Sequence, residues 1–507
     1  MARRVATVCI ALLLTAQLGV VHAGGCEQLA SRLHLPATTL TLATEVAAGA
    51  FRPPRGAPAA PYGSLPTFCR VAGTIRPTSD SDIRFEVWMP SKGWNGKLVG
   101  VGNGVWAGNI SYREMVGPVL KGYATAASNG GHEGDPLDAG FAAGHPEKLV
   151  DFGYRAVHET TRVAKATINA YYDRAARRSL FASCSTGGRQ GLMEAYRYPS
   201  DYDAISSMAP ANPWVPLLVS TLWTGNAALK SEASRIPPAK FALIHKAAVQ
   251  ACDADDGVTD GIISAPLRCH FDPGVLQCKG RDAADCLTAP QLAALRAIYQ
   301  GPRDPRTGKQ IFPGYVPGGE ALFPLKTAGP EPLGSSLTYM RALVFKDPKW
   351  DFRSFDYDQD VERARQVASS VTDVPASGLD RFFADGRKLL LSHGWADGFI
   401  ASMSTVEFYT VLVTRLGATR ADQALRLFMV PGMGHCSGGD GPFVIDALSA
   451  LDSWVETGRA PERIIASNPP GALPRTRPLC PYPQEAVYSG HGSTDLEQSF
   501  RCSAPGP

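Results

Sequence analysis

The sequence predicts an α/β fold, in which a mainly parallel sheet carries helices on both faces and a second, helical domain is inserted. Three observations predict it. Short apolar runs alternate with amphipathic helical patterns up to residue 210 and again after residue 383. Between residues 211 and 383 this alternation of strand and helix patterns is absent, and helical pieces, Asp/Gly turns and aromatic residues dominate. Finally, 507 residues exceed what one hydrophobic core usually organises.

The expected elements follow from hydrophobic periodicity. Residues 83–89 alternate as in a half-buried strand, and residues 97–101 form an apolar run typical of a buried strand. Further short strands are expected at 123–127, 179–182, 204–209, 388–394 and 425–430. Helices are expected at 151–172, 189–196 and 404–416, and a closing helix presents one apolar face made by Phe443, Val444, Ala447, Leu448, Leu451, Trp454 and Val455. The sheet domain thus comprises residues 24–210 and 384–507, and the inserted lid domain residues 211–383.

The pattern of residues 1–23 predicts a secretory signal. Arg3 and Arg4 supply positive charge, an apolar stretch follows, and Val-His-Ala at 21–23 is a plausible cleavage site. A membrane anchor is the alternative, but no second apolar span follows in the sequence. We therefore expect a secreted or periplasmic protein with no membrane contact once the signal is removed.

Charge and cysteine usage narrow the function classes. The net charge of +3 becomes 48 − 47, or +1, without Arg3 and Arg4, which gives no electrostatic case for nucleic acid or an anionic membrane as partner. Removing Cys9 leaves ten of the eleven cysteines, an even number that predicts five disulfides in an oxidising compartment. Zinc binding by thiolates is disfavoured because the sequence has no Cys-x-x-Cys pair.

The stretch Ser183-Cys184-Ser185-Thr186-Gly187-Gly188 lies between a predicted strand and a predicted helix. This context is typical of a nucleophile elbow, where a serine hydroxyl is exposed on a strained turn above a helix N-terminus. Ser183 replaces the first glycine of the usual Gly-x-Ser-x-Gly pattern, and it is still small. Ser185 is therefore the candidate nucleophile, and an ordinary tight strand-helix connection is the alternative.

A nucleophilic serine needs a base and an acid that orients the base. In α/β-hydrolases these follow the serine in the order acid, histidine, each on a loop after a strand. Asp397 follows the strand at 388–394, and His435 follows the strand at 425–430, within Pro-Gly-Met-Gly-His. His393 is the best rival as base, although it sits nearer the strand and is expected to support the acid loop. His132 and His158 are equally consistent with structural histidines.

Cysteines flank both candidates, since Cys184 precedes Ser185 and Cys436 follows His435. A hydrogen bond between Ser185 and His435 would place the cysteine Cα atoms in disulfide range, roughly 4.4–6.8 Å apart. Such a bridge would tie the two loops together. Cys184 as the nucleophile is the alternative, and the even cysteine count argues against its free thiol.

The patterns Cys-Ser-x-Gly-Gly, His-Gly-x-x-Asp and Pro-Gly-Met-x-His-Cys-Ser-Gly-Gly together resemble the tannase and feruloyl esterase family, which includes mono(2-hydroxyethyl) terephthalate hydrolase. The resemblance extends over nearly the whole mature chain. It implies an α/β-hydrolase fold with a large inserted lid, with Ser185, Asp397 and His435 as nucleophile, acid and base. It also implies an oxyanion hole made by the N–H groups of Gly102 and Thr186, where an ordinary turn is the alternative for residues 102–104. Relatives often have glycine where this chain has Val105.

The resemblance further implies the disulfide pairs Cys184–Cys436, Cys26–Cys69, Cys252–Cys269, Cys278–Cys286 and Cys480–Cys502. Residues 253–260 hold four carboxylates, a density that suits Ca²⁺ or a solvent-exposed acidic turn, and their spacing does not fit an EF-hand. The resemblance favours a structural Ca²⁺ in the lid. It assigns as ligands the side chains of Asp253, Asp256 and Asp260 and the carbonyls of Val258 and Ile262.

The expected function is that of a secreted serine esterase that cleaves small esters of phenolic or aromatic acids. The expected substrates derive from plant cell walls or polyphenols. The reaction is expected to pass through an acyl-enzyme and to need no organic cofactor. Feruloyl esters are the first expectation, galloyl esters the second and terephthalate monoesters the third. Aromatic residues at 339–355 are compatible with a substrate clamp, although such residues more often form a core. A non-catalytic phenolic- or carbohydrate-binding protein and a peptidase are the rival functions.

Overall fold

The computed structural model describes residues 25–54 and 61–504, so the predicted signal at 1–23 lies outside the described residues. Its centre is a nine-stranded mixed sheet in the order β1-β2-β3-β5-β4-β6-β7-β8-β9. Neighbours from β1 to β5 in this order are antiparallel, and those from β5 to β9 are parallel. The strands are β1 (Thr38–Val46), β2 (Phe68–Ile75), β3 (Ile83–Pro90), β4 (Lys97–Gly100), β5 (Ala124–Ser128), β6 (Arg178–Cys184), β7 (Ala204–Met208), β8 (Lys388–Gly394) and β9 (Leu425–Val430).

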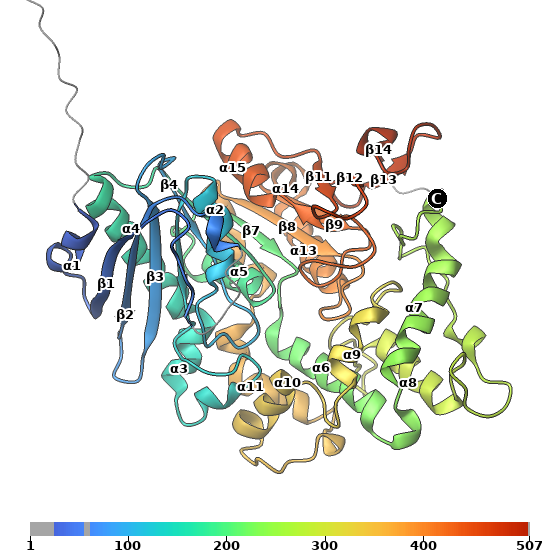
Figure 1. Ribbon diagram of the computed structural model, residues 1–507. Coiled ribbons are helices and arrows are strands. Elements are labelled where there is room, and N and C mark those ends of the chain that lie inside the picture. The colour runs from blue at the N-terminus through green and yellow to red at the C-terminus, as the bar shows by residue number, and fades with distance from the viewer. Residues whose placement is uncertain (1–24, 55–60, 505–507) are drawn as a thin grey trace, which may run out of the picture.

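Helices cover both faces of this sheet, because successive strand residues point to opposite sides. Val99 and Leu180 pack with α2 (Tyr112–Leu120) and α15 (Ala447–Thr457) on one face. The adjacent residues Leu98 and Phe181 face the other side. There the sheet is covered by α4 (Ala156–Tyr172), α5 (Thr186–Arg197) and α13 (Met403–Leu416). The α/β-hydrolase architecture expected from the sequence is therefore present (Figure 1).

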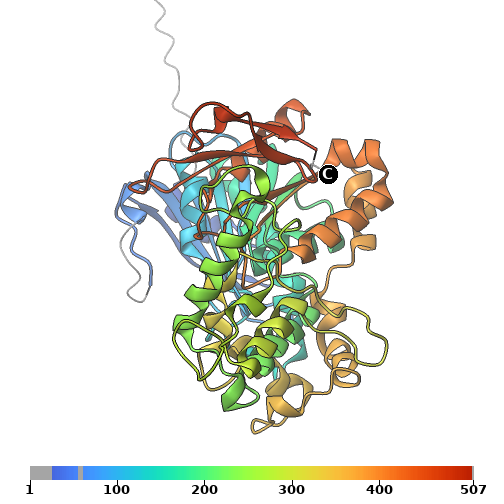
Figure 2. The same cartoon turned by 90° about the vertical axis from the view of Figure 1, so that its right-hand side faces the viewer.

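The insertion (residues 209–387) runs from the end of β7 to the start of β8 and adds no strand to the large sheet. Its helices are α6 (Trp214–Leu229), α7 (Pro238–Cys252), α8 (Ala289–Gln300), α9 (Pro324–Thr327), α10 (Gly334–Tyr339), α11 (Asp360–Thr372) and α12 (Asp380–Ala384). Phe382 and Phe383 of α12 pack in the core on one face of the sheet, whereas most of the other helices gather below the sheet in both views (Figures 1 and 2). Their apolar core also includes Trp106 and Phe152 from the earlier part of the chain, so the lid boundaries at 211 and 383 stay a prediction.

The remaining elements complete the sheet domain. They are α1 (Leu29–Arg32), α3 (Pro146–Val150), α14 (Ala418–Ala424), β10 (Val444–Ile445), β11 (Ile464–Ser467), β12 (Thr476–Leu479), β13 (Glu485–Tyr488) and β14 (Phe500–Ser503). The last five strands form a three-stranded and a two-stranded antiparallel sheet. Among the described residues, no helix is both long and apolar enough to cross a membrane.

The structure differs from the expected elements mainly at the ends of the chain. Residues 38–46 form strand β1, which the sequence analysis did not predict; their side chains are half-buried or exposed, so they lack a buried apolar run. The closing helix begins at Ala447, because Val444 and Ile445 pair with β11 instead. The helix expected from residue 151 opens with a π-helical turn, Asp151–Arg155, before α4 begins.

Candidate active site

Ser185 lies on the tight turn between β6 and α5. Its backbone has φ 62° and ψ −124°, a conformation that is strained for a residue with a side chain. The Ser185 N–H donates to the carbonyl of Met208 at the end of β7, at 3.0 Å, which ties the turn to the neighbouring strand. The turn therefore has the geometry of a nucleophile elbow, with the serine at the N-terminus of a helix.

Ser185, His435 and Asp397, the three residues nominated from the sequence, lie next to one another. His435 Nε2 lies 2.9 Å from Ser185 Oγ, and His435 Nδ1 lies 2.7 Å from Asp397 Oδ2. Because the carboxylate only accepts, Nδ1 carries the proton, and Nε2 is free to accept the serine hydroxyl proton. The Asp397 side chain is fully buried, whereas that of His435 is 20% exposed. The arrangement can activate the hydroxyl for attack on a carbonyl.

Asp397 is held as an anion by the groups around it. Its Oδ1 accepts the backbone N–H groups of Phe399 at 2.8 Å and Ile400 at 2.9 Å. Burial opposes its ionisation, but His435 and His393 outweigh burial and hold the pKa of Asp397 well below its usual range. The acid is therefore ionised and able to stabilise a positively charged His435.

His393 is a partner of the acid and makes no hydrogen bond to Ser185. Its Nε2 lies 3.1 Å from Asp397 Oδ2 and 3.2 Å from the carbonyl oxygen of Ile400, so this nitrogen must be the donor. Its Nδ1 then accepts the hydroxyl of Thr405 at 2.7 Å. Of the two histidines, only His435 is hydrogen-bonded to Ser185, which favours His435 as the candidate base.

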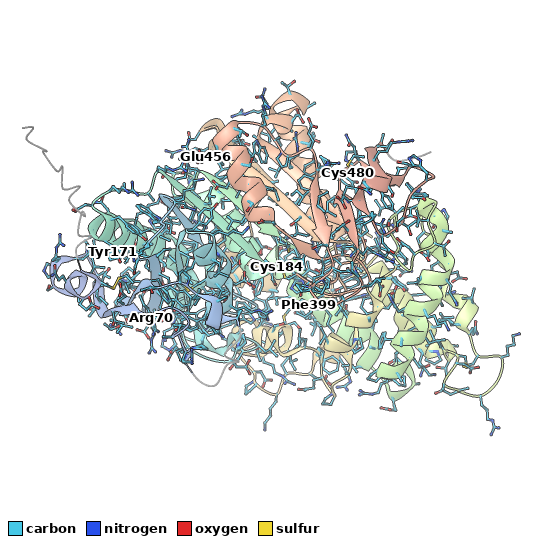
Figure 3. The ribbon with its side chains drawn as sticks, turned by 45° about the horizontal axis from the view of Figure 1, so that its top comes forward. Arg70, Tyr171, Cys184, Phe399, Glu456 and Cys480 are labelled. Carbon is cyan, nitrogen blue, oxygen red and sulfur yellow. A yellow bond between two sulfur atoms is a disulfide. The ribbon has the colours of Figure 1, made fainter. Side chains whose placement is uncertain are left out.

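The disulfide Cys184–Cys436 joins the turn of Ser185 to the loop of His435, with a Cα–Cα distance of 6.0 Å. It leaves Cys184 without a free thiol, which removes the alternative of a cysteine nucleophile. Figure 3 places Cys184 and Phe399 at the junction of the sheet and the insertion. The other four disulfides are Cys26–Cys69, Cys252–Cys269, Cys278–Cys286 and Cys480–Cys502, the pairs that the resemblance implies.

Gly102 lies against the start of α5, close to the elbow. A Cβ atom there would approach Gly187 Cα to 2.4 Å and Gln190 Oε1 to 2.5 Å, so only glycine fits. The Asn103 N–H donates to Gln190 Oε1 and the Gly187 N–H donates to the Asn103 carbonyl, which locks the loop onto the helix. Within the described residues, the N–H groups of Gly102 and Thr186 make no hydrogen bond, as expected of donors kept for a ligand.

Comparison with known proteins is consistent with this geometry. Residues 69–503 match the family described as tannase and feruloyl esterase. The protein belongs to this family. It is 40% identical to an uncharacterized esterase of Xanthomonas campestris pv. campestris (93% of this chain, 90% of the relative) and 32% identical to the mono(2-hydroxyethyl) terephthalate hydrolase of Piscinibacter sakaiensis (91% and 88%). The crystal structure of feruloyl esterase B from Aspergillus oryzae superposes with a TM-score of 0.88 at 27% identity, over 94% of this chain and 99% of that one.

This member of the tannase and feruloyl esterase family, a carboxylic ester hydrolase, has a partly buried acidic loop at 253–262. Asp253 accepts the N–H groups of Asp260, Gly261 and Ile262, and Asp256 accepts that of Val258. One oxygen of Asp260 pairs with Arg477, and the other is buried without a partner. Burial raises the pKa of both Asp256 and Asp260. Hard oxygen donors and an unpartnered carboxylate oxygen fit a calcium ion.

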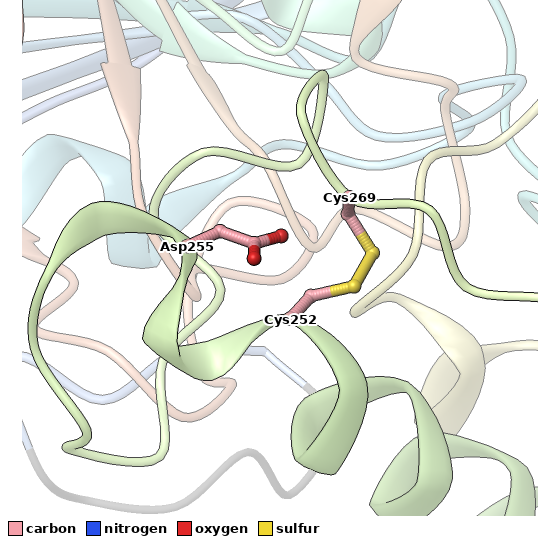
Figure 4. A group of neighbouring side chains, drawn as sticks. All are labelled: Cys252, Asp255 and Cys269. Carbon is pink, nitrogen blue, oxygen red and sulfur yellow. A yellow bond between two sulfur atoms is a disulfide. The ribbon is translucent and has the colours of Figure 1, made fainter. Parts of the chain in front are cut away.

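In the described residues, two groups of possible metal ligands have their ligand atoms within 4.8 Å of one another, and neither of them is the set of Asp253, Asp256 and Asp260. One is Asp255 beside Cys252 and Cys269 (Figure 4), but those sulfurs are bonded to each other and are not thiolates. The second is a buried acidic cluster of His158, Glu194 and Asp201. There His158 Nδ1 already contacts Asp201 at 2.6 Å and Lys165 supplies a positive charge 3.9 Å from the same carboxylate. The predicted calcium ligands thus stay a prediction.

Several residues that shape the esterase site were not nominated from the sequence. Gln190 holds the Gly102 loop through two hydrogen bonds to Asn103, each of 3.0 Å. The Phe399 ring lies 5.0 Å from the His435 ring, and Lys326 from the insertion donates to the Phe399 carbonyl at 2.6 Å. Gln190 could have been nominated from the sequence, because it is a polar residue near the start of the buried helix that follows the elbow. Nothing local links Lys326 to the site, because Phe399, the partner that connects it to the triad residues, lies 73 residues away.

Proposed function

We propose that Ser185, His435 and Asp397 are the catalytic triad of a secreted or periplasmic esterase, and that its substrates are esters of phenolic acids, feruloyl esters first. The observation that carries the proposal is the continuous hydrogen-bonded chain from Ser185 Oγ through His435 to Asp397. Membership of a family of ester hydrolases supports the reaction type. The five disulfides support an oxidising compartment.

Ester cleavage then follows from the geometry in two halves. Ser185 Oγ attacks the ester carbonyl carbon while His435 Nε2 takes its proton, and Asp397 stabilises the resulting imidazolium. The tetrahedral oxyanion accepts the N–H groups of Gly102 and Thr186, aided by the N-terminus of α5. His435 protonates the departing alcohol, which leaves an acyl group on Ser185. Water that gives its proton to His435 then attacks this acyl-enzyme, and His435 returns the proton to Ser185 Oγ as the acid is released.

The preference for a phenolic acid rests on the family and on its named relatives. The superposed structure is a feruloyl esterase B, which favours feruloyl esters. Galloyl esters are the second candidate, because the matching family also covers tannases. Terephthalate monoesters are the third, from the relative in Piscinibacter sakaiensis. A structural Ca²⁺, when bound to Asp253, Asp256, Asp260 and the carbonyls of Val258 and Ile262, would neutralise the acidic loop without entering the reaction.

The first test measures acid release from methyl ferulate and methyl gallate by the purified protein and by Ser185→Ala. Faster release of ferulic acid, reduced at least about a thousandfold in the variant, is the expected result. Preferential release of gallic acid would keep the triad and make the protein a tannase. A fully active Ser185→Ala protein would remove Ser185 as the nucleophile.

A fluorophosphonate probe separates the esterase from a non-catalytic binding protein. We expect one label per chain, lost in Ser185→Ala and retained in Ser453→Ala, a control serine exposed on α15. Absence of labelling, with phenolic ligands still bound, would favour the binding protein. Cleavage of casein without cleavage of either ester would favour a peptidase.

A further inference from the structure

Lys326 is a buried cation directly behind the loop of the catalytic acid. It lies on α9 of the insertion and is 1% exposed. Its ammonium donates to the carbonyl oxygen of Phe399 at 2.6 Å and to the hydroxyl oxygen of Tyr315. Tyr315 in turn donates its hydroxyl to the same Phe399 carbonyl at 3.3 Å. A lysine is rarely buried this completely without a specific partner.

The Phe399 peptide links Lys326 to the triad. Its carbonyl accepts from Lys326, while the Phe399 N–H donates to Asp397 Oδ1 at 2.8 Å. The centre of the Phe399 ring lies 5.3 Å from Lys326 Nζ and 5.0 Å from the centre of the His435 ring. One residue therefore connects the buried amine to both the acid and the base.

The insertion also contacts the acid loop through its backbone. A Cβ atom on Gly319 would lie 3.0 Å from both the Ala396 carbonyl oxygen and the Gly398 nitrogen, so the two segments are in close contact. The ionisable groups around the amine are Tyr315 from its own segment and Asp397 from the acid loop, with His393 and His435 beyond. Helix α6, which packs on α9, carries no charged residue.

We propose that Lys326 is a positioning residue for the catalytic acid: it fixes the Phe399 peptide so that its N–H points at Asp397, and its charge opposes protonation of His435. The proposal rests on the triad of the proposed function and is independent of the substrate class. Burial lowers the pKa of Lys326 to about 7, partly offset by attraction to Asp397. Lys326, close to the triad, therefore changes its charge near neutral pH.

Lys326→Met is the central test, because methionine fills a similar volume and carries no buried charge. Hydrolysis of p-nitrophenyl acetate should show kcat lower by about tenfold with KM changed less than about twofold. The acid limb of the kcat/KM profile should move upward by about half a pH unit, since a positive charge near His435 is gone. The melting temperature should stay equal or rise. A merely structural lysine would give the opposite pattern, a lower melting temperature with an unchanged pH profile.

Two variants refine the result. Lys326→Gln keeps a neutral donor, so kcat should recover in part while the pH profile stays shifted. Lys388→Met is the matched control, because Lys388 also donates to a backbone carbonyl, that of Gln423 at 3.0 Å, at the opposite end of β8. Its kcat and pH profile should equal those of the unchanged protein.

The proposal is overturned if Lys326→Met keeps the kcat and the pH profile of the unchanged protein, or if Lys388→Met loses as much. If Lys326→Met does not fold, Tyr315→Phe decides, because it removes the other hydrogen-bond partner of the amine while leaving the lysine in place. It should lower kcat, because the amine and the Phe399 carbonyl each lose a hydrogen-bond partner, while the pH profile changes little because the lysine charge remains. An unchanged kcat would refute the positioning role. An unchanged protein that neither hydrolyses p-nitrophenyl acetate nor takes up the fluorophosphonate would instead refute the triad itself.

Discussion

At the scale of single residues, the site depends on small side chains that let backbone segments approach. Ser185 keeps a positive φ despite its side chain, and the turn is stabilised by the bond of its N–H to Met208. A Cβ atom on Gly102 would clash with Gly187, and a Cβ atom on Gly187 would clash with the side chain of Ser183. The position of the two proposed oxyanion donors is therefore set by contacts that tolerate no added atom.

Gly102→Ala should damage the site because its new methyl group would lie 2.4 Å from Gly187 Cα. We expect kcat/KM for an aromatic ester to fall at least about tenfold and the free energy of unfolding to drop by about 1–3 kcal/mol. Ester hydrolysis and denaturant unfolding measure the two effects. Gly104→Ala is the control, since no atom lies within 4 Å of a Cβ built there. Equal effects at both positions would contradict the role of close packing at Gly102.

At the scale of elements, the insertion holds the loop that follows β9. His245 on α7 binds Glu320 through Nδ1 at 3.0 Å and Asp440 through Nε2 at 2.9 Å. Both ring nitrogens face carboxylates, so the imidazole is charged, and these two partners raise the pKa of His245 to about 10. Asp440 lies five residues beyond His435. Glu320 directly follows Gly319, which packs against the loop of Asp397. One imidazolium thus joins the insertion to the loop that carries His435, the proposed base.

The stability supplied by His245 should depend on pH with a definite sign. The folded protein keeps this proton up to about pH 10, whereas the unfolded chain releases it near the ordinary histidine pKa of 6.5. The contribution is therefore complete below about pH 6.5 and is lost as the pH rises to about 10. Allowing for partial solvent contact, we expect His245→Gln to lower the free energy of unfolding by about 3 kcal/mol at low pH and by little near pH 10.

Urea unfolding of both proteins between pH 6 and pH 10 measures this difference. His270→Gln, at an exposed histidine of the same insertion, is the control and should follow the unchanged protein at every pH. A destabilisation by His245→Gln that stays constant across this range would contradict a charged bridge.

At the scale of the whole molecule, the acidic loop at 253–262 joins the insertion to the C-terminal strands. Asp260 pairs with Arg477 on β12, and both side chains are about 5% exposed or less. Arg475 donates to the Asp260 carbonyl at 3.1 Å, and Arg268 pairs with Glu485 on β13. A cation bound to this loop would therefore stabilise the junction between distant parts of the chain.

Calcium removal tests this junction. We expect chelation with EGTA to lower the melting temperature by about 5 °C and added Ca²⁺ to restore it, because a ligand bound only to the folded state stabilises that state. Asp253→Asn should abolish this response, whereas Asp255→Asn, which changes an exposed carboxylate of the same loop outside the proposed ligand set, should keep it. An unchanged melting temperature in EGTA would mean that Arg477 and the loop N–H groups suffice without a metal.

Much of the sheet and of the proposed site could be predicted from local patterns. The strands at 97–100 and 388–394 contain short apolar runs, at 98–99 and 389–391, and the elbow has its own turn chemistry around Ser185. The order of serine, acid and histidine follows because each lies on a loop after a parallel strand. These features need only neighbouring residues, so the sequence by itself determined the fold class and nominated Ser185, Asp397 and His435.

The tertiary structure decided what depends on partners far apart in the chain. Ser185 and His435 are 250 residues apart, and only their hydrogen bond distinguishes His435 from His393 as the proposed base. Strand β1 lacks a buried apolar run and is specified by its pairing with β2. Lys326 and His245 likewise look like ordinary surface-type residues until folding brings Phe399 and Asp440 against them. Burial and long-range pairing assign their roles, and neither is encoded in any local pattern of residues.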